Sequence, residues 1–188
     1  MINIFSQREF PRQNCQKKIS ELYQTISKPV AVLAAGPSLP DDLISIFQKK
    51  AVYIGINHHA ERLVDLDFIV FTDRAEDVPG LKESLKSHKN KISMSNDSDY
   101  LLDVPYWKEG MTASLAIWFA CFAAKKEILL CGFDLWESNP SHFYKHSAGV
   151  GHLKGNLDHK INVHAKAWDE CFKPERIRAV SGPLTQIF

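Results

Sequence analysis

The sequence is poor in cysteine and lacks the cysteine pairs that bind metals or carry redox chemistry. Its 188 residues include four cysteines, and no two of them form a CxxC motif. Cys121 and Cys131 lie within apolar runs, where a free cysteine behaves as a small hydrophobic residue. The chain therefore does not depend on a disulfide framework, and we expect it in a reducing compartment, the cytoplasm.

An excess of one charge and long apolar runs are also absent. Lys and Arg total 23 against 22 for Asp and Glu, so the chain lacks the positive charge that holds nucleic acid non-specifically. No segment approaches the roughly 20 apolar residues of a membrane span, and the opening MINIFSQREFPRQN lacks the apolar stretch of a signal peptide. We expect neither a nucleic-acid partner nor a membrane span.

What the sequence does contain is an alternation of short β-type runs with longer amphipathic runs. The predicted strands cover residues 30–35, 51–56, 67–71, 91–95, 127–132 and 176–180. The predicted helices cover residues 15–26, 39–47, 78–87, 111–124 and 159–172. This order predicts one α/β domain over residues 1–188, a three-layer Rossmann-like domain with a mainly parallel sheet flanked by helices.

Two stretches follow neither period and are predicted to be loops. Residues 96–110 form a polar stretch that contains Pro105 and aromatic residues. Residues 133–158 form a long loop, and a loop of this length inside a compact domain is usually functional. We therefore expect residues 133–158 to act as an active-site loop or lid.

The turn after the strand at 30–35 has the composition of an anion-binding loop. Gly36 lets the backbone approach a phosphate, Pro37 presets the first helical turn, and Ser38 offers a hydroxyl beside the positive end of the helix. The turn is neither a GxGxxG fingerprint nor a Walker loop, which argues against NAD-binding proteins and P-loop NTPases. The alternative is a tight strand-to-helix turn with Ser38 as its N-cap.

Four motifs together resemble two related protein groups over most of the chain. They are AAGPSL, a strand that ends in Asn57, GMTASLAIWFA and KKEILLCGFDLW. The set resembles the bacterial family-42 sialyltransferases. It is also similar to the domain-of-unknown-function-115 group, which includes archaeal 6-hydroxymethylpterin pyrophosphokinase-like proteins and many phage proteins.

The sialyltransferase resemblance implies a nucleotide-sugar donor of the CMP-sugar type and a small-molecule acceptor. Its implied phosphate contacts are Gly36, Pro37 and Ser38. Its implied ribose or base contacts are Asn57, Thr112, Ser114 and Asp134.

The same resemblance implies catalytic residues in the predicted lid and in the helix after it. That family has two tyrosines that assist the departing phosphate; here Trp136 stands at the first position and Tyr144 is the candidate for the second. In that family a histidine acts as the general base, and His159 or His152 is the candidate here. His142 is a further candidate for contact with the ligand. Zinc is disfavoured, because no cysteine or third ligand is spaced to complete a tetrahedral set.

The pyrophosphokinase resemblance implies different chemistry. It calls for ATP, Mg²⁺ and attack by a hydroxymethyl group, with Asp73 and Asp134 at strand ends as the metal-binding carboxylates. In the alternative without metal, Asp73 is a turn residue and Asp134 is a loop or helix cap.

Together these features favour a nucleotide-binding transferase of the CMP-sugar glycosyltransferase type with a histidine base. A Mg²⁺-dependent pyrophosphokinase and a non-catalytic nucleotide-binding protein are the alternatives. The glycosyltransferase needs no cofactor, whereas the pyrophosphokinase needs Mg²⁺. Both alternatives stay open at this point, as do the oligomeric state and the identity of the nucleotide.

Overall fold

A parallel sheet organises the chain in the computed structural model, which describes residues 17–93, 98–101, 112–134 and 174–186. The strands are β1 (Lys17–Lys18), β2 (Val30–Leu33), β3 (Val52–Ile56), β4 (Phe68–Val70), β5 (Lys91–Ser93), β6 (Tyr100–Leu101), β7 (Ile128–Cys131) and β8 (Ile177–Ala179). They form one eight-stranded sheet in the order β1-β6-β5-β4-β3-β2-β7-β8, and each pairing is parallel. The predicted α/β architecture with a parallel, Rossmann-like sheet is confirmed.

The two faces of the central strands bury separate sets of apolar side chains. Successive residues of a strand point to opposite faces of the sheet. Val30, Val32, Ile128 and Leu130 therefore join one core cluster, and the residues between them in β2 and β7 join the other. Because both faces are covered, β2 and β7 appear in the sequence as the uninterrupted apolar runs VAVL and ILLC.

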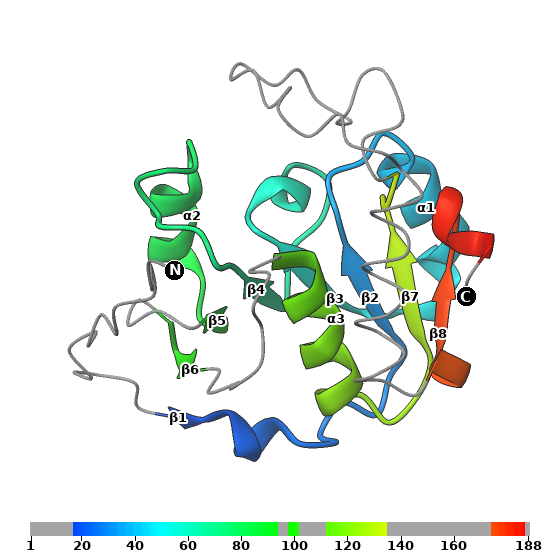
Figure 1. Ribbon diagram of the computed structural model, residues 1–188, viewed down its shortest axis with the longest axis horizontal. Helices are drawn as coiled ribbons and strands as arrows, with labels where there is room; N and C mark the ends of the chain where they lie inside the picture. Colours follow the sequence, from blue (N-terminus) through cyan, green and yellow to red (C-terminus); the bar gives the residue numbers. More distant parts are fainter. Residues whose placement is uncertain (1–16, 94–97, 102–111, 135–173, 187–188) are drawn as a thin grey trace, which may run out of the picture.

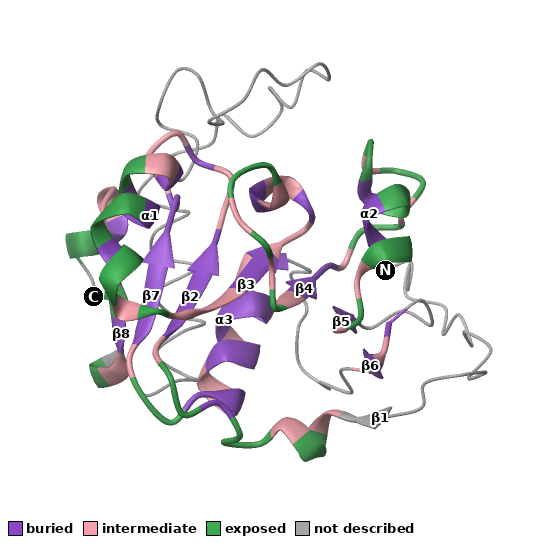
Figure 2. Cartoon of the chain, turned by 180° about the vertical axis from the view of Figure 1, so that it is seen from behind, coloured by how far each residue is buried: buried purple, intermediate pink, exposed green. Residues whose placement is uncertain are grey.

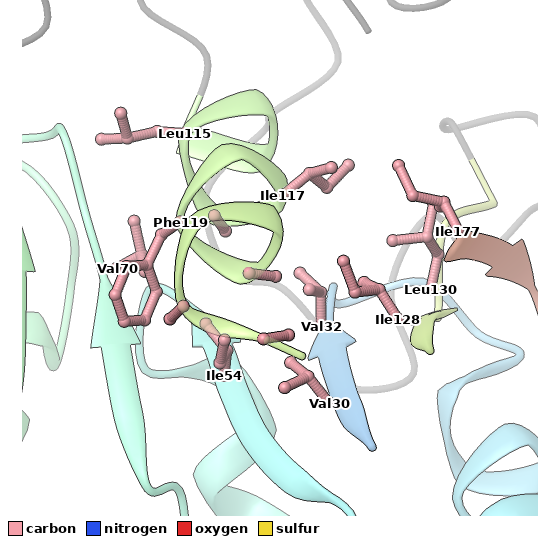
Figure 3. Packing of buried hydrophobic residues seen from close by; sticks show 14 of the residues in the cluster. Val30, Val32, Ile54, Val70, Leu115, Ile117, Phe119, Ile128, Leu130 and Ile177 are labelled. Atoms are coloured by element: carbon pink, nitrogen blue, oxygen red, sulfur yellow. The ribbon is translucent and has the colours of Figure 1, made fainter. Parts of the chain in front are cut away.

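Helices cover both of these faces, which gives the three predicted layers. Helix α3 (Thr112–Ala123) lies against β2, β3 and β4 (Figure 1), and its residues Leu115, Ile117 and Phe119 belong to the core cluster on this face (Figure 3). Helix α1 (Leu39–Ile46) packs against β7 on the opposite face and leaves its outer side exposed (Figure 2). No helix in the described ranges has the length and apolar character needed to cross a membrane.

A smaller cluster attaches helix α2 (Leu81–Ser87) to the β4 side of the sheet. Leu81 and Leu85 pack with Ile69 and Phe71. The short 3₁₀ helix η3 (His59–Arg62) is joined to the same region by Glu61. Its Oε1 accepts a hydrogen bond from Ser84 Oγ at 2.6 Å and lies 2.5 Å from His88 Nε2. The loop after β3 is thereby fixed beside α2.

The prediction of a leading helix over residues 15–26 is wrong for the described part of that segment. Residues 17–18 form strand β1, and residues 19–22 form the 3₁₀ helix η1 (Ile19–Leu22). The backbone N–H groups of Gln24 and Ile26 then donate to the carbonyl oxygens of Phe122 and Ala123 at 3.1 and 3.0 Å. The apolar residues of this segment do recur at helical spacing, but the backbone of residues 24 and 26 bonds to the end of α3 and does not continue a helix.

The polar stretch 96–110 was also predicted wrongly in one place, because it contains strand β6. Two residues are too few to show the alternation by which a strand is recognised in a sequence. The other predicted strands and the helices near α1, α2 and α3 agree with the structure to within a few residues. The predicted helix 159–172 and nearly all of the predicted lid lie outside the described residues.

The C-terminal end of α3 is held by Arg176, which precedes β8. Its Nη1 and Nη2 donate to the carbonyl oxygens of Ala124 and Cys121 at 2.8 and 3.2 Å. We expect Arg176→Ala to lower the free energy of unfolding by about 2 kcal/mol, because a charged donor to two helix-end carbonyls is lost. Urea unfolding curves measure this change.

The matched control for that variant is Arg178→Ala. Arg178 is an exposed residue of β8 in the described structure. Its replacement should change the free energy of unfolding by less than about 0.5 kcal/mol. Equal losses for the two variants would contradict the role assigned to Arg176.

Candidate functional site

The sheet reverses its order between β2 and β7. From β2 the chain runs outward through β3, β4, β5 and β6, and it then returns to add β7 and β8 on the other side of β2. Residues Leu33 and Cys131 are paired, so β2 and β7 end at the same level. In open parallel sheets, ligands bind beyond the carboxyl ends of the strands at such a reversal. We call this side of the molecule the carboxyl edge.

Two donors of Ser38, in the loop after β2, converge on one oxygen of Asp134, in the loop after β7. The backbone N–H of Ser38 and its hydroxyl lie 3.0 and 2.9 Å from Asp134 Oδ2. Ser38 is the N-cap residue of α1 by position, but its hydroxyl makes no capping hydrogen bond. The N-cap alternative therefore does not describe this side chain, whose partners are carboxylates.

The prediction that Pro37 presets the first turn of α1 is wrong. The proline in that turn is Pro40, whereas Pro37 precedes the N-cap. Next along the helix, the N–H of Leu39 donates to the carbonyl oxygen of Gly36 at 3.1 Å. The N–H and hydroxyl of Ser38 are thus the donors that this turn directs at an anionic oxygen.

Gly36 is required by the close approach of the two loops. A Cβ atom at this position would collide with Asp134 Oδ2 and with the carbonyl oxygen of Gly132. The Gly36 N–H instead donates to that carbonyl at 2.9 Å. The contact that demands glycine here is with the protein itself, and contact with a phosphate stays a prediction.

Asp42 lies behind Ser38 and was not identified from the sequence. Only 3% of it is exposed, and its Oδ2 accepts the Gly132 N–H at 2.8 Å and lies 3.2 Å from Ser38 Oγ. Asp42 could have been identified from the sequence, because it lies on the same helical face as the apolar residues Leu39, Leu43 and Ile46.

The protonation of Asp42 is shifted by this environment. Burial raises the pKa of its carboxyl group, while the hydrogen bond from Gly132 and the hydroxyl groups of Ser181 and Ser38 lower it, and the charge of Asp134 raises it further. The Ser181 hydroxyl faces this carboxylate without reaching hydrogen-bonding geometry. Ser38 has one hydroxyl hydrogen, so it donates to Asp42 or to Asp134 but not to both at once.

The loops after β3 and β4 form a second polar group at the carboxyl edge. Asn57 adopts a left-handed backbone conformation with φ of 54°, and its Nδ2 donates to Asp73 Oδ2 at 3.3 Å. The hydroxyl groups of Thr72 and Thr112 lie 2.5 Å apart, which joins the end of β4 to the start of α3. The structure thus brings three predicted ligand contacts, Asn57, Asp73 and Thr112, to this edge.

Ser114 differs from these three residues because it belongs to the buried part of α3. Its exposed fraction is 3%, so it is not a surface group of the carboxyl edge. The predicted residues Trp136, His142, Tyr144, His152 and His159 lie outside the described residues.

Buried polar atoms without a hydrogen-bond partner concentrate at the same edge. Among the described residues they are Asn57 Oδ1, His58 Nδ1, Ser181 Oγ and Arg176 Nε. The first three follow the carboxyl ends of β3 and β8, whereas Arg176 precedes β8. Unpartnered buried polar groups are rare in folded proteins and call for an explanation. Their distribution supports the carboxyl edge as the functional side.

His58 is the other residue that sequence reasoning missed. It directly follows Asn57, and 8% of it is exposed. Its Nε2 would lie 2.9 Å from a Cβ atom on Gly80, so it packs closely against the start of α2. Burial lowers the pKa of the His58 imidazole, while Glu61 and Glu83 raise it and Arg62 lowers it.

The two carboxylates predicted to hold Mg²⁺ each accept a hydrogen bond from the protein. Asp73 Oδ2 accepts from Asn57, and Asp134 Oδ2 accepts from Ser38. Within the described part of the chain, no group of three or more His, Cys, Asp or Glu residues is arranged to hold a metal ion.

Comparison with protein-family models, curated proteins and solved structures finds no significant match for the chain. The sialyltransferase and pyrophosphokinase resemblances therefore stay predictions. The function has to be argued from the geometry of the carboxyl edge.

The raised pKa of Asp42 predicts a pH-dependent contribution to stability. Its pKa in the folded state lies above the unfolded value of 3.8, so the folded state binds this proton more tightly. The stabilisation is complete below that value and is lost as the pH rises through the folded pKa. Relative to Asp42→Asn, the wild type should gain unfolding free energy as the pH falls from 7 towards 4, measured by urea unfolding. A pH-independent difference would contradict this, and the exposed neighbour Asp41 provides the control variant Asp41→Asn.

The lowered pKa of His58 predicts a pH dependence of stability with the opposite sign. Its folded pKa lies below the unfolded value of 6.5, so its contribution to stability is complete above 6.5 and is lost as the pH falls through the folded pKa. The wild type should lose unfolding free energy relative to His58→Gln as the pH falls from 7 to 5. The neighbouring variant His59→Gln is the control. A difference that stays constant over this range would show that His58 is not held neutral by burial.

Proposed function

We propose that the chain is a nucleotide-binding transferase whose ligand lies across the carboxyl edge near β2, β7 and β3. A phosphate oxygen of the ligand binds to Ser38, and the nucleoside lies towards Asn57 and Thr112. The observation that carries this proposal is the convergence of the Ser38 N–H and hydroxyl on one anionic oxygen, at 3.0 and 2.9 Å.

Three physical properties make that position suitable for a phosphate. Hydrogen bonds to a charged acceptor are about twice as strong as neutral ones. The position lies at the N-terminus of α1, where the helix dipole favours negative charge. It also lies where the strand order reverses, between the ends of β2 and β7.

The nucleoside part of the proposal rests on the loops after β3 and β4. Asn57 Oδ1 is a buried acceptor without a hydrogen-bond partner in the described structure. An amino or hydroxyl group of a base or ribose would supply the missing donor. Asp73 holds the Asn57 amide through Nδ2 and so fixes which way Oδ1 points.

The favoured reaction is glycosyl transfer from a CMP-sugar. The bond between the sugar and the phosphate oxygen breaks, the phosphate leaves as CMP, and an acceptor hydroxyl forms the new bond to the sugar. The hydroxyl proton goes to a histidine, for which His159 and His152 are the candidates. The order of motifs along the chain supports this choice over other nucleotide-dependent reactions.

A second candidate, Mg²⁺-dependent pyrophosphoryl transfer, is favoured by the acidic character of the edge. Asp42, Asp134 and Asp73 all lie in or beside the loops that would receive a polyphosphate. Three phosphate groups beside these carboxylates would need a cation to offset the repulsion. Mg²⁺ held by Asp73 or Asp134 would supply that charge.

The proposal is tested by thermal-shift titration with CMP, CDP, UDP, GDP, ATP and CMP-sialic acid, each with and without Mg²⁺. A ligand at 100 times its Kd stabilises the folded state by about 2.7 kcal/mol. A metal-independent shift with cytidine nucleotides supports glycosyl transfer, and a shift with ATP that needs Mg²⁺ supports the second candidate. No shift with any nucleotide contradicts both.

The variant Ser38→Ala connects this binding to the proposed position. Losing the hydroxyl removes one of the two donors to the phosphate, but the same hydroxyl binds Asp134 in the free protein, which offsets part of the loss. Nucleotide affinity should therefore fall by about twofold to tenfold. Ser45→Ala is the matched control, because Ser45 lies on the same helix and, among the described residues, its hydroxyl bonds to the helix carbonyl of Asp42, at 2.7 Å. Gly36→Val is unsuitable, since its side chain would collide with Asp134 whether or not a ligand binds.

A further inference from the structure

We propose that the carboxylate of Asp134 is an internal competitor of the ligand, which binds a phosphate at Ser38 only by displacing it. This inference rests on the proposed function and deepens it. It assigns Asp134 the role of a specificity-determining residue, in place of the ribose or metal contact predicted from the sequence.

The donors at Ser38 cannot serve two acceptors at full strength. The backbone N–H and the hydroxyl each carry one hydrogen, and both lie within 3.0 Å of the same atom, Asp134 Oδ2. A phosphate oxygen that used this donor pair would occupy the position of Oδ2. The two negatively charged oxygens would also repel each other at such a distance. Binding of the phosphate and the present position of Asp134 are therefore mutually exclusive.

Asp134, rather than Asp42, is the carboxylate that gives way. Asp42 is held from behind by the Gly132 N–H at 2.8 Å and is almost fully buried. Asp134 is only half-buried, and both of its described hydrogen bonds come from Ser38. Rotation of the Asp134 side chain frees both donors and leaves the bond between Asp42 and Gly132 in place.

An internal competitor selects the class of ligand. A carboxylate tethered to the same site has a high effective concentration, so a free anion does not displace it at ordinary concentrations. A ligand that is also anchored elsewhere on the edge competes on equal terms. The geometry therefore points to a phosphate ester with an attached nucleoside, and it excludes inorganic phosphate and simple carboxylates as ligands.

The test compares Asp134→Asn with the wild type by calorimetric titration in buffer with chelator and without Mg²⁺. CDP is the phosphorylated probe, and cytidine is the probe without phosphate. The asparagine keeps an oxygen of similar shape but without charge, so the competing bonds become about half as strong. CDP should bind about tenfold more tightly to Asp134→Asn, and the affinity for cytidine should not change.

Asp41→Asn is the matched control for general electrostatics. It removes one negative charge from the same helix terminus, where Asp41 is exposed and in the first turn of α1. Its effect on CDP affinity should stay below about twofold at 0.15 M salt, because exposed charges are screened. Equal gains in the two variants would overturn the proposal, since the gain would then come from net charge alone.

The wild type offers a second measurement that does not need the variant to fold. The Ser38 amide resonance should shift on addition of CDP and not on addition of cytidine, because its acceptor is exchanged. An unchanged Ser38 amide in a CDP-bound protein would overturn the inference.

The remaining outcomes separate this inference from the proposed function. If the wild type binds CDP and Asp134→Asn binds it equally or more weakly, Asp134 does not compete with the ligand and only the inference fails. If neither the wild type nor Asp134→Asn binds CDP, ATP or CMP-sialic acid, with or without Mg²⁺, the proposed function fails and the inference fails with it.

Discussion

Strands β2 and β7 pair in parallel through the middle of the sheet, and every residue of both strands is buried. Covering both faces of this pair requires α3 on one side and α1 on the other. The chain adds strands outward from β2 in one direction and from β7 in the other, so the strand order reverses between these two strands. The position of the candidate site follows from this pairing, because the two loops leave the sheet at the same level.

At that point the chain brings carboxylates and donors together at close range. Gly36 lets the loops after β2 and β7 touch, and Asp42 holds the Gly132 N–H from behind. Ser38 then lies between Asp42 and Asp134, with one hydroxyl hydrogen for two acceptors. A site of this kind is arranged for an anionic oxygen before any ligand arrives, and in the free protein it is satisfied by the protein's own carboxylate.

Such an arrangement separates the stability of the free protein from the affinity of its ligand. The hydrogen bonds between Ser38 and Asp134 satisfy the end of α1, so the loop keeps its shape without a ligand. If a phosphate binds as we propose, the same bonds must be exchanged, which reduces the net gain from each new contact. In the proposed complex, selection then depends on the rest of the ligand, through the loops after β3 and β4.

The sequence by itself determined the parallel α/β architecture and most of its elements. Buried strands such as 30–33 and 128–131 need continuous apolar residues, and α3 needs an apolar surface wide enough to lie over several strands. It also identified the turn at Ser38 and the polar strand ends at Asn57 and Asp73. Only the tertiary structure decided which groups meet: that Ser38 bonds to Asp134, 96 residues away, that Asp42 lies behind it, and that residues 24–26 bond to the end of α3. The physical reason is that apolar periodicity reports which face of an element is buried, whereas hydrogen-bond partners far apart in the chain are fixed by the order of the strands.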